Sequence, residues 1–166
     1  MPFALHPQLA ADTLEVTRLV LSSVRLMNDR TWPWLVLVPE REDAVELIDL
    51  VADDREILME EIALASTVLR DLFQPNKLNV AALGNQVGQL HVHVIARRHQ
   101  DAAWPRPVWG TQPPAPYSAH DRDTTVAALQ DAFKVSISRF EALRDLASRA
   151  PAESSGFLSL LGFTDR

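Results

Sequence analysis

The segment from residue 89 to residue 95 restricts the folds open to this chain more than any other. It reads QLHVHVI, in which polar and apolar residues alternate. An alternation of period two predicts a β-strand, because successive side chains on a strand point to opposite faces. We expect a strand over residues 89–98 whose core face is made by Leu90, Val92, Val94 and Ala96. The opposite face then holds a polar row, hereafter the histidine row, of Gln89, His91 and His93, which Ile95 and Arg97 continue.

The histidine row has no evident packing purpose. Two imidazoles and an amide on one rigid strand suit phosphate chemistry, a metal ion, or simple pairing across the sheet. The residues alone leave these three readings open, so the rest of the chain has to decide between them.

The composition limits the class of protein and the cellular compartment in which the histidine row can act. A length of 166 residues with 47% hydrophobic and 23% charged residues predicts one ordinary domain. The chain has no cysteine, which excludes disulfides and thiolate chemistry. The first residues lack the basic start and apolar run of a signal peptide, and no apolar stretch is long enough to span a membrane. We therefore expect a cytoplasmic protein without a membrane partner.

The net charge of −6 argues against an extended nucleic-acid surface. A small anionic ligand stays compatible with an acidic chain, because a local site can be positive. We expect a small molecule as the partner, and no nucleic acid.

The remaining patterns predict strands, a helix, further strands and a late helix. After a helical turn near residues 8–11, we expect strands over 13–21, 23–27, 34–38 and 77–83, with a short helix over 43–50. A longer helix is predicted from Asp53, where Glu56 completes a capping box, to Pro75. Its apolar stripe consists of Leu58, Ile62, Ala65, Leu69 and Leu72. This order is typical of an α+β fold with an antiparallel sheet.

The last third of the chain has a different character. Residues 101–120 are rich in proline and contain Trp104 and Trp109, which we expect to anchor an irregular segment by packing. A helix is predicted from residue 123 to 148, and residues 156–163 form an apolar tail that needs a partner surface. We expect residues 1–120 to form the domain, and residues 121–166 to pack on it or on a dimer partner.

Segment 89–95 resembles the histidine triad (HIT) motif, His-φ-His-φ-His-φ-φ, where φ is apolar. Here the first histidine is replaced by Gln89, while the other two and all apolar spacers are present. Residues 26–39 resemble the early nucleotide-binding strands of this family, with Asn28 at the place of its asparagine and Trp34 where many members have a further histidine. The pair Gly84-Asn85 resembles the loop near the phosphates. The likeness covers roughly residues 13–110.

This resemblance implies an α+β nucleotide-binding fold: a HIT-like antiparallel sheet with a long helix packed on it, here with a C-terminal helical extension. Members hydrolyse or transfer nucleotides and are usually dimeric. The chain looks most like the bacterial branch of diadenosine tetraphosphate hydrolases. By the same resemblance, His91 is the nucleophile.

The residues themselves suit this chemistry. A neutral imidazole can attack an α-phosphorus through Nε2 if Nδ1 keeps its proton, which a neighbouring backbone carbonyl would hold. His93 could donate to a non-bridging phosphate oxygen. Gln89 can also donate, but it cannot exchange a proton, so protonation of the leaving group is the weakest step. A polyphosphate leaving group depends least on that step.

Further candidates surround the row. We expect Asn85 and Gly84 on the phosphate side, Asn28 at the ribose, and Arg97 as a source of positive potential. Trp34 either stacks on a base or packs in the core. The mechanism requires no metal ion or other cofactor, although Mg²⁺ is compatible with a polyphosphate substrate.

Three functions follow from these expectations. The first is a nucleotide hydrolase or transferase acting on dinucleoside polyphosphates such as diadenosine tetraphosphate, which by the same resemblance is expected to be a homodimer. The second is a nucleotide-binding protein with weak or no catalysis, which the departures at Gln89 and Trp34 suggest. The third is a metal site built on His91 and His93 with a carboxylate from elsewhere.

Overall fold

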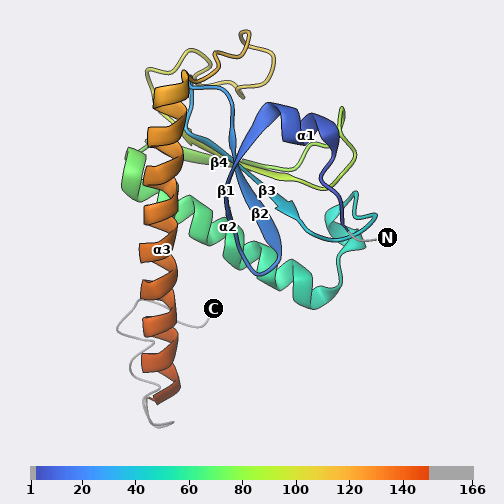
Figure 1. Cartoon of the computed structure of the whole chain (residues 1–166), viewed down its shortest axis with the longest axis vertical. Coiled ribbons are helices and arrows are strands. Elements are labelled where there is room, and N and C mark those ends of the chain that lie inside the picture. Colours follow the sequence, from blue (N-terminus) through green and yellow to red (C-terminus); the bar gives the residue numbers. More distant parts are fainter. Residues whose placement is uncertain (1–2, 150–166) are drawn as a thin grey trace.

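The computed structural model describes residues 3–149, with side chains as far as residue 142. The elements in chain order are α1 (Pro7–Asp12), β1 (Thr13–Arg18), β2 (Ser22–Met27), β3 (Trp34–Pro39), the short 3₁₀ helix η1 (Leu47–Asp49), α2 (Ala52–Phe73), β4 (Lys77–Ala81), β5 (Val92–Arg97) and α3 (Ala119–Arg149). The five strands form one antiparallel sheet in the order β1-β2-β3-β5-β4 (Figure 1). The predicted α+β fold with an antiparallel sheet, a long helix on it and a C-terminal helix is confirmed.

The sheet is covered on both faces, and β3 shows why its sequence is apolar throughout. Leu35 and Leu37 face a core made with α2 and α3, whereas Trp34, Val36 and Val38 face a second core. That second core contains Leu9 of α1 and buried residues of the proline-rich segment 101–118. Figure 1 shows α2 and α3 on one side of the sheet, with α1 on the other. A strand buried on both faces needs no polar alternation.

The apolar residues that alternate with the histidine row face the core, as predicted. Val94 and Ala96 lie in the core beneath α2 and α3, and Leu90 and Val92 lie in a third cluster near the start of α2. The strand itself is shorter than expected, since β5 begins at Val92 rather than at residue 89. The backbone N–H of Leu90 donates to the Ala44 carbonyl, which takes it out of the sheet ladder.

Two helix predictions were wrong in detail. Residues 43–50 form only the one-turn η1, because the Asp49 carboxylate accepts the backbone N–H groups of Val45 and Glu46 and closes a tight loop. The expected capping box at Asp53 is absent, since α2 begins at Ala52 after Val51, whose side chain makes no cap.

The body of α2 follows its predicted stripe closely. Leu58, Ala65 and Leu69 are buried, but Leu72 is 40% exposed and Val68 is buried in its place. The helix ends at Phe73, one residue before Gln74 takes a left-handed conformation and two before Pro75.

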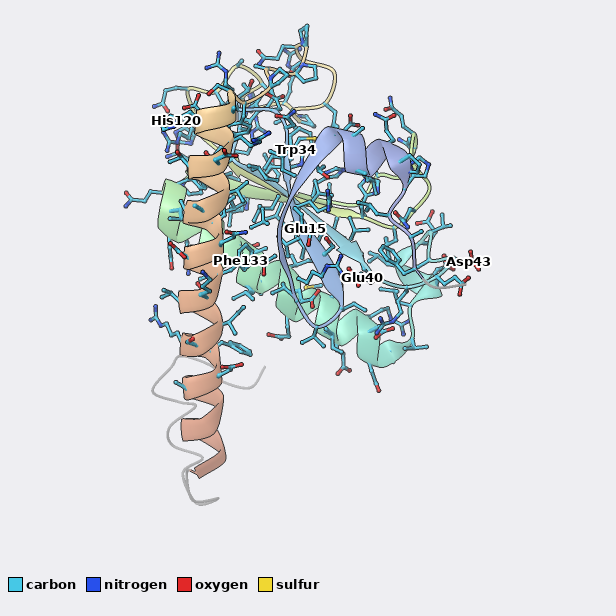
Figure 2. The ribbon with its side chains drawn as sticks, in the orientation of Figure 1. Glu15, Trp34, Glu40, Asp43, His120 and Phe133 are labelled. Carbon is cyan, nitrogen blue, oxygen red and sulfur yellow. The ribbon has the colours of Figure 1, made fainter. Side chains whose placement is uncertain are left out.

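The C-terminal helix α3 begins four residues earlier than expected and joins the main core. Leu129 and Phe133 are fully buried against α2 and the sheet. Figure 2 shows Phe133 on the part of α3 that lies beside the sheet, and Figure 1 shows the helix continuing past it. The predicted apolar tail, residues 156–163, lies outside the described residues. None of the helices in the described range is long and apolar enough to cross a membrane.

Candidate functional site

The register between β3 and β5 builds the site. Trp34 pairs with Ile95, and Val36 pairs with His93, so Trp34 lies diagonally across from His93 on the same face of the sheet. Large side chains reach such diagonal neighbours. The indole Nε1–H of Trp34 donates to Nδ1 of His93 over 2.9 Å. Trp34 therefore contacts a member of the histidine row directly, a role that its sequence position does not indicate.

His91 has the arrangement expected of a nucleophilic imidazole. Its Nδ1 lies 2.7 Å from the backbone carbonyl oxygen of Gln89. A carbonyl can only accept, so Nδ1 carries the proton and the lone pair of the neutral ring lies on Nε2. The expected backbone acceptor is thus present, two residues before the histidine that it holds.

His93 has the opposite arrangement. Because an indole N–H can only donate, Nδ1 of His93 accepts and the proton of the neutral ring lies on Nε2. Burial, and to a smaller extent the positive charge of His91 when that ring is protonated, together lower the pKa of His93 from 6.5 to about 4. At neutral pH, His93 is therefore an uncharged donor through Nε2, next to His91, whose proton-bearing nitrogen in the neutral form is Nδ1.

Aromatic rings enclose the two histidines. The His91 and His93 rings meet edge to face with centroids 4.9 Å apart, and Trp109 meets His93 at 5.3 Å and Trp34 at 5.5 Å. We call these four side chains the aromatic cluster. His91 is 7% exposed and His93 is 5% exposed, so the pair sits in a largely dry environment where hydrogen bonds to phosphate oxygens are stronger. Trp109 comes from the proline-rich segment, and its predicted packing role brings it against His93 and Trp34.

The side chain of Gln89 binds the N-terminal segment. Its amide oxygen accepts the backbone N–H of His6 at 2.8 Å, and its amide nitrogen donates to the Ala4 carbonyl at 2.9 Å. Phe3 and Leu5 of that segment pack partly buried in the same core as Trp34. The structure thus places Gln89 as a clamp on residues 4–6, with both ends of its amide occupied.

Two other candidates are also occupied by protein groups. The amide oxygen of Asn28 accepts the backbone N–H of Tyr117 and holds the end of the proline-rich segment. Arg97 is only 1% exposed, and its guanidinium binds both oxygens of Asp101, the side chain of Asn79 and the carbonyl of Arg106. The Arg97 hydrogen bonds lower the pKa of Asp101 to about 2.

The loop before β5 holds the remaining pair. Gly84 has a positive φ of 69°, which favours glycine, and Asn85 is exposed beside it. Both stay candidates for phosphate contacts. Among the residues that the structure describes, no group of three or more metal-binding side chains is arranged to hold a metal ion.

Sequence patterns missed the Trp34–His93 and Trp109–His93 contacts. The first joins residues 59 positions apart and depends on β3 pairing with β5, which are not consecutive strands. The second depends on the path of a segment without regular structure. Neither has a local sequence signal, apart from the presence of tryptophan in a segment that resembles a nucleotide site.

Comparison with known proteins identifies the family to which this fold belongs. The HIT domain family model matches residues 9–100. A histidine triad protein of Bradyrhizobium japonicum is 47% identical, with 80% of this chain and 99% of that chain covered and a TM-score of 0.78. Another from Marinobacter aquaeolei VT8 is 44% identical over 81% of this chain and 98% of that one, with a TM-score of 0.79. No curated protein matches the chain. With its fold, its histidine row and these relatives in agreement, the chain belongs to the HIT domain family.

Proposed function

We propose that this protein hydrolyses or transfers nucleotides through a covalent nucleotidyl intermediate on His91. The observation that carries the proposal is the 2.7 Å contact between Nδ1 of His91 and the Gln89 carbonyl, which leaves Nε2 as the basic nitrogen. This is the protonation pattern that a nucleophilic imidazole needs at neutral pH.

The reaction has two displacements. The Nε2 lone pair of His91 forms a bond to the α-phosphorus, while the bond from phosphorus to the leaving-group oxygen breaks and that oxygen keeps the electron pair. Water, or another acceptor hydroxyl, then attacks the same phosphorus and loses its proton to solvent, while the P–N bond breaks and Nε2 keeps the electron pair. The neutral His93 donates its Nε2–H to a non-bridging oxygen in both steps, and a donor fixed before the reaction starts lowers the barrier without rearranging.

The leaving group defines the substrate class. The described interactions of His91 and His93 involve a backbone carbonyl, the two tryptophans and each other, and none of these is a carboxylic acid. The amide of Gln89 is occupied and cannot supply a proton. A phosphoric anhydride is cleaved most readily under these conditions, so we propose dinucleoside polyphosphates such as diadenosine tetraphosphate. Mg²⁺ then travels with the substrate, and the protein needs no resident metal.

The test is to trap the intermediate. The protein is mixed with diadenosine tetraphosphate, quenched at alkaline pH because phosphohistidine is acid-labile, and digested for mass spectrometry. A nucleotidyl mass on His91 supports the proposal, and it should vanish in His91→Ala. The exposed His99 provides the matched control, since His99→Ala should keep the adduct. Product formation that continues in folded His91→Ala would overturn the mechanism.

A second function is favoured by the enclosure of the site. His91 and His93 are nearly buried, and the side chains of Gln89 and Asn28 are bound to other parts of the chain. A protein that binds nucleotides without turning them over fits this enclosure. Calorimetric binding of adenosine nucleotides, with no adduct and no product, would establish it instead of catalysis. We further propose a homodimer, which light scattering of the purified protein tests directly.

A further inference from the structure

We propose that Trp34 is a positioning residue that fixes the tautomer of His93 through its indole N–H, and so directs the Nε2–H of His93 at the substrate phosphate. This inference rests on the proposed function for its catalytic consequence. The tautomer itself is a property of the free protein and can be measured without any substrate.

The hydrogen bond between Trp34 and His93 allows only one placement of the protons. Nε1 of Trp34 lies 2.9 Å from Nδ1 of His93, and an indole nitrogen has a hydrogen but no available lone pair. A proton on Nδ1 would point two donors at each other. The neutral His93 ring therefore carries its proton on Nε2, the atom on the far side of the ring from Trp34.

The surroundings also prevent the ring from reversing. His93 is 5% exposed and meets Trp34, Trp109 and His91 edge to face at 5.3, 5.3 and 4.9 Å. Turning the ring over would place a carbon opposite the indole N–H and leave a buried donor unpaired. Trp34 thus fixes the orientation of the ring as well as its protonation.

A neighbouring tryptophan shows what packing alone looks like. Trp32 is 2% exposed and belongs to the same core as Trp34. Within the described part of the chain, its indole nitrogen has no hydrogen-bond partner. Trp32→Phe is therefore a matched control, which removes an indole N–H from the same core without removing a hydrogen bond.

The histidines also differ in their partners. Nδ1 of His91 meets an acceptor, whereas Nδ1 of His93 meets a donor. Adjacent imidazoles of one row are thereby held in opposite tautomers. One presents a lone pair and the other a hydrogen, which is what attack on a phosphorus with a stabilised oxygen requires.

The experiment combines spectroscopy and kinetics. In protein with ¹⁵N-labelled histidine, two-bond ¹H–¹⁵N correlation spectra distinguish the tautomers, and we expect His93 to be the Nε2–H form in the natural chain. Trp34→Phe should introduce the Nδ1–H form, whereas Trp32→Phe should leave the spectrum of His93 unchanged. A His93 tautomer that is unchanged in folded Trp34→Phe would overturn the proposal.

Kinetics then test the catalytic consequence. Trp34→Phe should slow nucleotidylation of His91 by about tenfold or more, as for the loss of an aligned donor. In a His93→Ala background the same change should cost nothing further, because no side chain remains for the indole N–H to orient. Equal losses in both backgrounds would refute the positioning role and leave only packing. If Trp34→Phe fails to fold, benzothienylalanine at position 34 keeps the shape and replaces the N–H with sulfur.

Different results would refute the proposed function and the proposed role of Trp34. Absence of a nucleotidyl adduct in the natural protein refutes the proposed function, while the tautomer spectra still decide whether Trp34 sets the state of His93. A retained adduct with an unchanged tautomer refutes only the role of Trp34.

Discussion

Acidification from about pH 7.5 to about pH 5 should destabilise this protein through His93. The pKa of the folded-state ring lies at about 4, because the ring is buried and next to His91, whereas a histidine in an unfolded chain titrates near 6.5. Between these two values the unfolded chain binds more protons than the folded one. Stability therefore rises with pH across this window and is fully present above it.

The size of the effect follows from the same values. At about pH 5 the unfolded ring is almost fully protonated and the folded ring is almost fully neutral, which lowers the free energy of unfolding by about 2 kcal/mol. Below about pH 4 the folded ring is protonated as well, and the contribution of His93 stops changing. The carboxyl of Asp101 acts in a separate and lower window, since its pKa of about 2 keeps its contribution intact until the pH falls below about 3.8.

Urea denaturation at a series of pH values measures this effect. The comparison variant is His93→Asn, whose side-chain oxygen can still accept the indole N–H of Trp34 but does not titrate. The natural chain should lose about 2 kcal/mol more than this variant between the two pH values, with equal denaturant slopes. Parallel pH profiles for both proteins would refute the conclusion that His93 is buried in its neutral form.

Other contacts give further predictions. Gln89→Ala should speed hydrogen exchange of the His6 amide by about fivefold, as expected for a lost hydrogen bond of about 1 kcal/mol, and unchanged exchange would contradict the clamp. Asp101→Asn leaves the buried guanidinium of Arg97 without its counter-charge and should lower the free energy of unfolding by about 3 kcal/mol in urea denaturation; a loss below about 1 kcal/mol would mean that the pair is solvated. Phe133→Ala should cost about 3–5 kcal/mol by leaving a cavity beneath α3, whereas Phe140→Ala, at a residue that is 45% exposed, should change stability by no more than about 0.5 kcal/mol. Similar losses for the two would show that α3 is not anchored at this core.

Local patterns predicted the elements that depend on local burial. The stripe on α2 through Leu58, Ala65 and Leu69 could be predicted because it repeats with the helical period. The strand β3 could be predicted because a short, continuously apolar run is typical of a strand buried on both faces. The prediction of a capping box at Asp53 was wrong, because the start of α2 involves a contact between residues far apart in the sequence. The neighbouring Asp54 forms a bidentate pair with Arg41, thirteen residues earlier, and a local pattern gives no indication of such a partner.

In the candidate site, too, contacts between residues close in the sequence could be predicted and contacts between distant residues could not. The carbonyl that holds His91 lies two residues away, so chemistry and strand geometry together predicted it. The length of β5 could not be predicted, because Leu90 bonds to Ala44 rather than to a neighbouring strand. The partner of His93 also required the order of strands, since Trp34 reaches it only through the pairing of β3 with β5.

Gln89 and Trp34 have one physical property in common. Neither side chain ionises or changes tautomer, so the donors and acceptors of each are fixed. An amide offers an oxygen and an N–H side by side, and Gln89 uses both on the backbone of residues 4–6. An indole offers only an N–H, so Trp34 imposes one tautomer on His93, whereas a histidine at position 34 could accept or donate. The hydrogen-bond roles around His91 and His93 are therefore set by groups that do not titrate, and His91 and His93 alone among these four side chains can exchange a proton.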